Sequence, residues 1–573
     1  MENTKKRPVA PKDPITKTPF FYIMQDKEIY ATEQADGIGV QEIYQNDNRL
    51  INSATITGNV TDEYQLELLK TTSGFRKLVY AIGVSVMESS AREKVRFVYQ
   101  MYGKTDMYGT GTNLILDMIA DGKEHMIYLD EAEWSDDDKE PGQIRFEFGQ
   151  SKLQATVSVR FYLREGFQAP EVIQDEVIDE NSLDYQAMIQ RSLLQLGNTA
   201  RVQKVIQKAK SGEEVTIAFI GGSITQGAGA IPIHTKCYAY QTYLEFSEQF
   251  GLGENVKFIK AGVGGTPSQL GVIRFERDVL REGMVEPDIV IVEFAVNDEG
   301  DETKGICYES LVRKILALPN EPAVVMLFAV FAYDWNLQER LAPIGQHYEL
   351  PMVSIRDAVS EQFCLKKDEG RVLSKNQFFY DIYHPSNIGH GIMKECLIYM
   401  FKEAAKQKPM EDQTTKLMQK EVVYGKDYEH IRLFDRKTAH QVCKVAEGTF
   451  CEIDMQLQSV EMDENPEQIP MFSNNWYRTG TDNSKKDFFE MEIQCRALML
   501  VYKDSGAVEV GKAEVFVDGK RVLVADPHVN GWVHCNTVIL LQGQTSEVHH
   551  IKIQMALEDL EKKFTILGFG YVE

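Results

Sequence analysis

The pattern of hydrophobic and polar positions changes twice along the chain. From about residue 20 to 185, short segments rich in Val, Tyr and Phe partly alternate between apolar and polar positions, as in "KLVYAIGVSV", "EKVRFVYQMYG" and "QATVSVRFYLRE". This alternation is typical of β-strands with one buried face. We therefore expect a β-sandwich-like domain over residues 1–184, with the acidic segment "DEAEWSDDDKEPGQ" as a solvated loop between strands.

Residues 185–407 follow a different pattern. "YQAMIQRSLLQLG" and "ARVQKVIQKAKSG" have helical spacing, and the second ends at Lys-Ser-Gly. Apolar stretches then recur at intervals of roughly 30 residues, in "VTIAFI", "NVKFIKAG", "DIVIVEF", "AVVMLFAVF" and "PMVSI". Strands this apolar need cover on both faces, so the pattern predicts an α/β domain with a parallel sheet between two helical layers. A last helix through "NIGHGIMKECLIYMFKEAAKQ" closes the domain.

The strand pattern returns after a polar segment, residues 408–425, which we interpret as a linker. Residues 426–573 contain "FFEMEIQCRALMLVYKD", "AEVFVDGKRVLVAD" and "HHIKIQMALED", and Asp518-Gly519 is a typical hairpin turn. We expect a second β-sandwich here, one that could bind carbohydrate.

Composition narrows the classes of function. A chain of 573 residues is too long to fold around one hydrophobic core, so we expect several domains. Its formal charge of -24 argues against a nucleic-acid or anionic-membrane partner. No apolar run reaches the ~18 residues of a membrane span, and the N-terminal segment lacks the apolar core of a secretory signal. The eight cysteines are scattered without a Cys-x-x-Cys pair, which favours free thiols and a cytoplasmic protein and indicates no metal site. The composition leaves the oligomeric state open.

The segment "IAFIGGSITQGAGA", residues 217–230, runs from an apolar strand into a sharp turn that presents Ser223. It lacks the Lys of a phosphate-binding P-loop and the Gly-x-Gly-x-x-Gly of a dinucleotide site. It also lacks the second Gly of the Gly-x-Ser-x-Gly elbow, since Thr225 stands there. By itself Ser223 is more typical of a helix N-cap than of a nucleophile.

Later segments supply what a serine nucleophile needs. "AGVGGTPSQLG" offers backbone N–H groups in a glycine loop, Asn297 in "AVNDEG" offers a side-chain amide, and Asp381 and His384 in "FYDIYHPSNIGH" are three residues apart. The first two segments follow strands of the predicted sheet. Because ligands of such sheets bind at the carboxyl ends of the strands, we expect all these groups to meet there.

Taken together, these segments resemble the SGNH/GDSL hydrolase superfamily, in the branch of carbohydrate esterases that carry a "GGSIT" first block. "GGSIT", "AGVGG", "VND" and "DIYH" correspond in order to its four blocks. The resemblance implies Ser223 as nucleophile, His384 as base and Asp381 as its orienter, with no cofactor or metal. It also implies an oxyanion hole made by the N–H groups of Ser223 and Gly265 and the side chain of Asn297. Two positions depart from the family: Gly222 replaces the Asp before the serine, and Val296 replaces a Gly.

Aromatic residues are candidates for binding the substrate. Tyr333 and Trp335 in "YDWN" follow the fourth strand, and Trp476 and Trp532 lie beside turn-forming residues of the C-terminal domain. A loop-tip indole can stack on a sugar ring, although each of these rings could equally fill a core. The sequence thus predicts a serine esterase that removes acetyl or other small acyl groups from plant-derived oligosaccharides. A lipase, lysophospholipase or thioesterase on the same scaffold, and a non-catalytic carbohydrate-binding protein, stay as alternatives.

Overall fold

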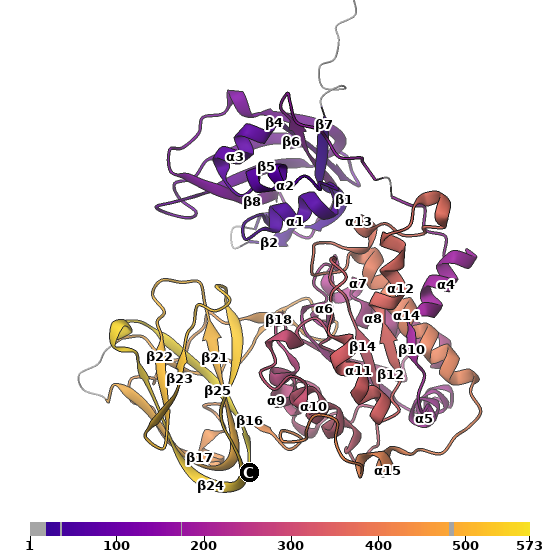
Figure 1. The fold of residues 1–573 in the computed structure, drawn as a ribbon, viewed down its shortest axis with the longest axis vertical. Coiled ribbons are helices and arrows are strands. Elements are labelled where there is room, and N and C mark those ends of the chain that lie inside the picture. Colours follow the sequence, from indigo (N-terminus) through magenta and orange to yellow (C-terminus); the bar gives the residue numbers. More distant parts are fainter. Residues whose placement is uncertain (1–18, 35–36, 174, 481–485) are drawn as a thin grey trace, which may run out of the picture. The chain divides into compact units, whose positions relative to one another are not determined.

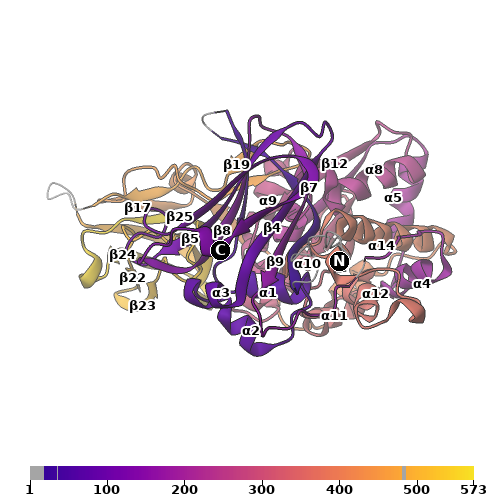
Figure 2. The same cartoon turned by 90° about the horizontal axis from the view of Figure 1, so that it is seen from above.

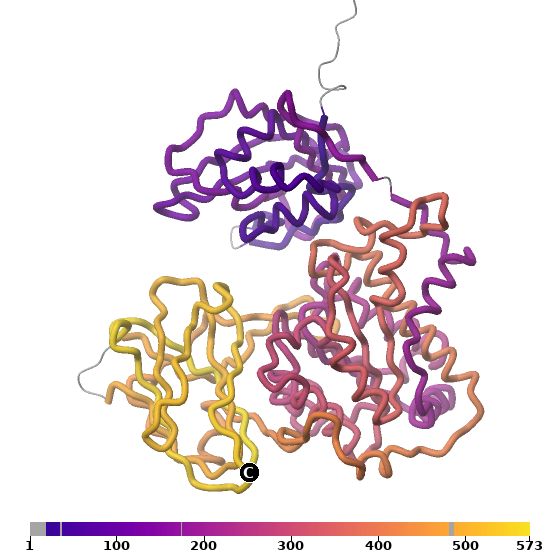
Figure 3. The backbone as a smooth tube through the Cα atoms, in the orientation of Figure 1, coloured from indigo at the N-terminus to yellow at the C-terminus, as the bar shows by residue number. Residues whose placement is uncertain are grey.

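The protein is described by a computed structural model over residues 19–34, 37–173, 175–480 and 486–573. It divides into two compact units: Met1–Val177 with Leu373–Ile382, and Ile178–Val372 with Tyr383–Glu573. The backbone trace in Figure 3 follows the chain from the N-terminal β-rich part through an α/β part to a C-terminal β-rich part. The predicted α/β domain with β-rich flanking domains is confirmed. The domain boundaries stay a prediction, and the first 18 residues, which carry most of the segment examined for a signal, lie outside the described residues.

The first unit contains two antiparallel sheets around one hydrophobic core (Figure 1). One sheet has the order β1-β9-β4-β7 and the other β2-β3-β8-β5-β6. The strands are β1 (Phe20–Tyr30), β2 (Thr32–Glu33), β3 (Gly39–Tyr44), β4 (Val79–Glu88), β5 (Lys94–Gly103), β6 (Asn113–Ile119), β7 (Asp121–Tyr128), β8 (Asp138–Phe148) and β9 (Gln154–Leu163). Three short helices, which the strand pattern did not predict, separate β3 from β4: α1 (Arg49–Ile56), α2 (Glu63–Leu68) and α3 (Thr72–Leu78). The expected acidic loop is shorter than predicted, because β8 already begins at Asp138 and pairs with β5.

A distant segment, Leu373–Ile382, belongs to this unit and contains α13 (Lys375–Phe378). The buried Lys27 of β1 donates from Nζ to Asn376 O at 2.8 Å and to Phe379 O at 2.6 Å. Asp175 accepts hydrogen bonds from the side chains of Ser374 and Asn376. Burial lowers the pKa of Lys27 to about 8, although Asp175 and Asp381 oppose the shift. The N-terminal domain therefore includes ten residues from the middle of the chain.

The sheet of the second unit has the order β10-β15-β14-β13-β11-β12 (Figure 1). Its strands are β10 (Leu193–Gln195), β11 (Val215–Gly221), β12 (Val256–Gly262), β13 (Ile289–Glu293), β14 (Ala323–Phe328) and β15 (Met352–Ser354). All neighbours are parallel except β10, which runs antiparallel to β15. The helix predicted over "YQAMIQRSLLQLG" is shorter than expected. α4 (Leu183–Arg191) ends because the residues that follow form β10 and pair with the edge of the sheet.

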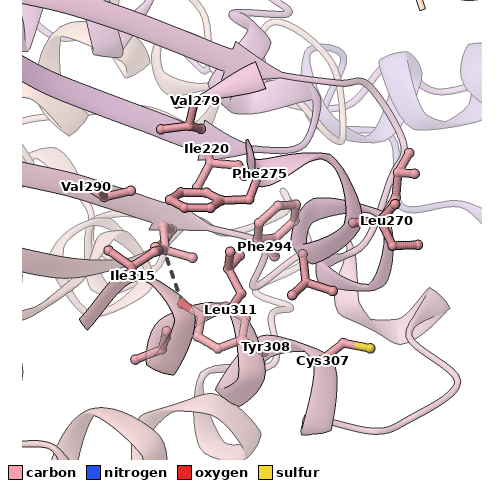
Figure 4. Packing of buried hydrophobic residues seen from close by; sticks show 14 of the residues in the cluster. Ile220, Leu270, Phe275, Val279, Val290, Phe294, Cys307, Tyr308, Leu311 and Ile315 are labelled. Carbon is pink, nitrogen blue, oxygen red and sulfur yellow. Dashed lines mark hydrogen bonds between the residues drawn. The ribbon is translucent and has the colours of Figure 1, made fainter. Parts of the chain in front are cut away.

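The two faces of the sheet bury alternate residues of each strand. On β11 the ring of Phe219 packs on Tyr238 of α8, whereas Ile220 joins the core with residues of α9 and α10. Figure 2 shows α5, α8 and α14 gathered together, and Figure 4 shows Ile220 among Phe275, Phe294 and Leu311. The helices are α5 (Ala200–Lys210), α6 (Ser223–Gln226), α7 (Ile233–Lys236), α8 (Tyr238–Phe250), α9 (Ser268–Asp278), α10 (Ile306–Leu316), α11 (Gln338–His347), α12 (Ile355–Val359) and α14 (Asn387–Lys406). Period-two burial explains why these strands are apolar at nearly every position.

The C-terminal residues form a β-rich domain after a segment that is not purely a linker, since it contains α15 (Thr414–Met418). Eight strands join one hydrogen-bonded sheet, because the long β21 (Phe488–Asp504) and β24 (His534–Met555) pair along their length. The others are β16 (Arg432–Phe434), β17 (Cys443–Ala446), β20 (Trp476–Arg478), β22 (Ala513–Val517), β23 (Lys520–Ala525) and β25 (Phe564–Val572), while β18 (Ser459–Glu461) and β19 (Gln468–Pro470) pair separately. The predicted hairpin turn is present: Asp518 and Gly519 both have positive φ, at 50° and 78°. Among the described residues, no helix is long and apolar enough to cross a membrane.

Candidate active site

Ser223 lies at the carboxyl end of β11, as the first residue of the four-residue helix α6. Two glycines make the turn possible. A Cβ at Gly221 would lie 2.1 Å from Thr225 Oγ1, and one at Gly222 would lie 2.0 Å from Asn297 Oδ1. At Gly221 the backbone oxygen of Glu293, 2.4 Å from such a Cβ, also excludes a side chain, whereas a side chain at Gly222 would have to displace the amide of Asn297. The departure from the family at Gly222 therefore accompanies this placement of Asn297.

The side chains of Ser223 and His384 meet. His384 Nε2 lies 3.0 Å from Ser223 Oγ, a hydrogen-bond distance at which the imidazole can take the hydroxyl proton. His384 precedes α14, whose N-cap Ser386 accepts the N–H of Gly389. Asp381 belongs to the first unit with Leu373–Ile382, so its pairing with His384 stays a prediction.

The glycine loop after β12 passes beside Ser223. A Cβ at Gly264 would lie 3.7 Å from Ser223 Cβ, which places the loop in van der Waals range of the serine. The Gly264 N–H donates to Gln226 Oε1 at 3.1 Å. The Gly265 N–H has no hydrogen-bond partner within the described part of the chain, and Gly265 has a φ of +71°. Of the two N–H groups, Gly265 is thus the one left for a ligand.

Asn297 and Asp298 follow β13 and tie this loop to the next one. Asn297 Oδ1 is buried without a hydrogen-bond partner among the described residues. The oxyanion role needs the amide nitrogen of Asn297 as donor, so that role stays a prediction. The fully buried Asp298 accepts the N–H and the hydroxyl of Ser268, at 2.7 and 2.9 Å, at the start of α9. The carboxyl group of Asp298 therefore connects the Asn297 turn to the helix that follows the glycine loop.

A buried carboxyl group lies beneath the serine turn. Glu293 Oε2 accepts the Thr225 hydroxyl at 3.1 Å, and Thr225 Oγ1 lies 2.8 Å from the Tyr238 hydroxyl. Burial raises the pKa of Glu293 to about 7, despite hydrogen bonds from Thr225 and Gly222 that favour the anion. Glu293 is therefore protonated in mildly acidic solution.

His390 has a structural environment. Its Nε2 lies 3.1 Å from Ala228 O, its Nδ1 accepts the Tyr238 N–H at 3.2 Å, and its ring stacks on Tyr238. Burial lowers its pKa to about 3. A neutral imidazole with both nitrogens engaged suits a packing role and not that of a second base.

Sequence reasoning missed Arg274 on α9. Its fully buried guanidinium donates to Ala261 O at 2.8 Å and to Gly221 O at 2.9 Å, at the ends of the two strands that lead into the site. Asp278 pairs with it one helical turn later. Arg274 and Asp278 four residues apart could have suggested a helical ion pair, but nothing in the sequence indicates its carbonyl partners.

The aromatic candidates fall in three places. Tyr333 is 58% exposed, and Trp335 stacks on Phe331, whose ring also contacts Tyr383 beside His384. Trp532 is 45% exposed and reaches the glycine loop, since a Cβ at Gly265 would lie 3.0 Å from its Cζ2.

The prediction for Trp476 is corrected. This indole is only 1% exposed and packs between Phe489 and Phe569, so it fills the core of the C-terminal domain. Its neighbours along the chain are turn residues, but β20 pairs with β25 and draws the ring inside.

Comparisons with known proteins show what the chain is similar to in sequence and fold. The GDSL-like Lipase/Acylhydrolase family matches residues 219–392. The crystal structure of a two-domain esterase active on acetylated mannans covers 67% of this chain and 99% of its own, with 25% identity and a TM-score of 0.55. The same esterase co-crystallised with mannopentaose covers 67% and 98%, again with 25% identity and a TM-score of 0.55. No curated protein matches the chain in sequence. These similarities support a carboxylic ester hydrolase of the GDSL type.

Proposed function

We propose that this chain, whose residues 219–392 form a GDSL-like lipase/acylhydrolase domain, is a serine esterase that removes O-acetyl groups from plant-derived oligosaccharides. The observation that carries the proposal is the 3.0 Å contact of His384 Nε2 with Ser223 Oγ, beside a glycine loop whose Gly265 N–H has no partner among the described residues. A nucleophile, a base and a donor within one site are the parts that acyl transfer needs.

The reaction proceeds in two steps. His384 Nε2 takes the proton of Ser223 as Oγ bonds to the acetyl carbonyl carbon, and the C–O bond to the sugar then breaks as the imidazolium returns that proton to the sugar oxygen. Water attacks the acetyl-serine with His384 again as base, which releases acetate and restores the hydroxyl. Asp381 is proposed to orient the ring and to stabilise its charged form.

The negative charge that develops on the carbonyl oxygen needs donors placed in advance. The N–H groups of Ser223 and Gly265 and the side-chain amide of Asn297 are proposed for this role. Such donors matter most in the transition state, where removal of one typically costs about 10²–10³ in kcat.

Substrate recognition is proposed from the aromatic side chains at the site. Trp532 beside the glycine loop, and Tyr333 with Trp335 near His384, offer flat apolar faces on which sugar rings can stack. The structurally similar two-domain esterase is described as active on acetylated mannans, which supports a carbohydrate ester here. The proposed location is the cytoplasm, which the eight scattered cysteines without a Cys-x-x-Cys pair favour. Cell fractionation tests it.

The triad is tested by substitution. Ser223→Ala and His384→Ala should each lower turnover of a nitrophenyl acetate by several orders of magnitude, because the two groups act as a unit. Asp381→Asn should also be severe, since the imidazolium loses its counter-charge. Near-native activity in Ser223→Ala would refute the assignment.

Substrate class is tested separately. Mass spectrometry of acetylated plant oligosaccharides, before and after incubation, should show loss of acetyl groups with the unaltered protein and none with Ser223→Ala. Nitrophenyl esters of increasing acyl chain length and a matched thioester cover the alternatives. A preference for long acyl chains would indicate a lipase or lysophospholipase, and a preference for the thioester would indicate a thioesterase. Sugar binding without turnover of any ester would indicate a carbohydrate-binding protein.

A further inference from the structure

The glycine loop is held from the C-terminal domain by the side chain of Gln458. Its Nε2 donates to Gly264 O at 2.8 Å, and its Oε1 accepts the Cys535 N–H at 3.0 Å. Gln458 is only 8% exposed. The two contacts define which end of the amide is nitrogen, since the reverse orientation would oppose two donors at Cys535 and two acceptors at Gly264.

The geometry of the peptide bond between Gly264 and Gly265 links the Gln458 contact to the orientation of the Gly265 N–H. The one cis peptide bond of the described residues is Ile231–Pro232, so the bond after Gly264 is trans. In a trans peptide the C=O and N–H point in opposite directions. Because Gly264 O faces Gln458, the Gly265 N–H faces away from Gln458, and it has no partner in the part of the chain that the structure describes.

His534 holds the next peptide of the same loop. Its Nε2 lies 3.1 Å from Gly265 O, and burial lowers the pKa of His534, so a neutral ring with its proton on Nε2 donates to that carbonyl. Both carbonyl groups on either side of the Gly265 Cα are therefore bound by side chains of the C-terminal domain.

A peptide between two glycines needs such support. Glycine adopts positive and negative φ with similar ease, so rotation of the Gly264–Gly265 peptide plane meets little local resistance. Rotation by half a turn would present a carbonyl oxygen where the N–H stood and would repel a developing oxyanion. The loop sequence alone does not select the productive orientation.

We propose that Gln458 is a positioning residue of the esterase: by binding Gly264 O, it directs the Gly265 N–H toward the oxyanion formed on Ser223. This inference rests on the proposed function of Ser223 and Gly265. It assigns the C-terminal domain a part in the chemical step, in addition to any part in binding sugar.

The test compares Gln458→Leu with the unaltered protein on a nitrophenyl acetate, which is too small to need a sugar platform. We expect kcat to fall by about tenfold or more with KM within about twofold, since the donor acts on charge that develops in the transition state. Affinity for phenylboronic acid, whose tetrahedral serine adduct places an oxygen in the oxyanion site, should weaken in parallel. Gln542→Leu is the matched control, because it removes a single side-chain contact of a glutamine with Tyr428 elsewhere in the C-terminal domain, and its kcat should not change.

Gln458→Glu covers the case in which the leucine variant does not fold. The carboxylate still accepts the Cys535 N–H but repels Gly264 O, so kcat and boronate affinity should again fall together. A kcat within about twofold of the unaltered protein in the folded variants, or a lower kcat with unchanged boronate affinity, would overturn the inference. Full activity of Ser223→Ala would instead defeat the proposed function; an inactive Ser223→Ala beside a fully active Gln458→Leu would defeat this inference alone.

Discussion

At the scale of single residues, the Asn297 amide occupies the space that a side chain at Gly222 would need. A β-carbon at Gly222 would lie 2.0 Å from Asn297 Oδ1 and 2.7 Å from its Cγ, far below contact distance, so the Asn297 side chain would have to move. The family's aspartate at this position would therefore require a different placement of the Asn side chain.

Gly222→Ala should displace the Asn297 amide and lower kcat on a nitrophenyl acetate by about 10²-fold, since displacements near 1 Å in a site have that effect. Gly391→Ala in α14 is a suitable control, because a Cβ there has its nearest contact at 3.9 Å. Steady-state kinetics and thermal unfolding of both variants give the comparison. Unchanged kcat in Gly222→Ala would mean that Asn297 does not act from the position described.

The raised pKa of Glu293 predicts that the stability of the protein depends on pH. In the folded protein its pKa is about 7, against an ordinary value of 4.5, so the folded state holds a proton that the unfolded state has lost between these values. Stability contributed by the neutral carboxyl is therefore present below pH 4.5 and declines as the pH rises toward 7. Glu293→Gln should remove this decline.

The measurement is urea unfolding of both proteins at pH 5 and pH 8. The variant should gain stability relative to the unaltered protein at the higher pH. The change in unfolding free energy between pH 5 and pH 8 is compared between the two proteins, so the contributions of other titrating groups such as His390 cancel. A difference between the two proteins that is the same at both pH values would contradict the raised pKa.

At the scale of elements, two tryptophans of one domain have opposite environments. Trp532 lies in the loop before β24, nearly half exposed against the glycine loop, whereas Trp476 on β20 is enclosed by phenylalanines. The same residue type, beside similar turn residues in the sequence, thus occurs once at the candidate site and once in the core.

Trp532→Ala should reduce activity on acetylated oligosaccharide while activity on a nitrophenyl acetate is kept. Trp476→Ala should instead lower stability by about 3–5 kcal/mol through the cavity it leaves, and affect both substrates alike. Kinetics on the two substrates with melting temperatures distinguish these outcomes. Equal loss on both substrates in Trp532→Ala would give that indole a structural role.

Elements of strong periodicity were predictable from the sequence, and contacts between distant segments were not. The apolar runs of β11 to β15, the turn at Ser223 and the hairpin at Asp518-Gly519 follow from local pattern and turn chemistry. The antiparallel edge strand β10 was missed because its three residues continue the helical spacing of α4. Gln458 and His534 lie 194 and 269 residues from the glycines that they contact, and no local signal reports such a partner.

At the scale of the whole molecule, the first unit depends on Lys27. Its ammonium group is buried and satisfies two carbonyl groups of the segment Leu373–Ile382. Replacement by an apolar residue would leave both carbonyls without their donor.

Lys27→Met should lower the midpoint of thermal unfolding, since each buried carbonyl left unpaired costs about 1–3 kcal/mol. Lys94→Met on β5 provides a control at an exposed position. An unchanged midpoint in Lys27→Met would show that the segment is held by its other contacts, such as those of Asp175.

This long-range contact has a consequence for synthesis on the ribosome. Lys27 and Asn376 are 349 residues apart, and the entire parallel sheet of the second unit is encoded between them. At about 5–20 residues per second, the N-terminal strands wait roughly 17–70 s after leaving the ribosome before their last segment emerges. The N-terminal domain is therefore translated first but cannot be completed until after β15, and during this interval Lys27 has to remain hydrated or bound to a chaperone.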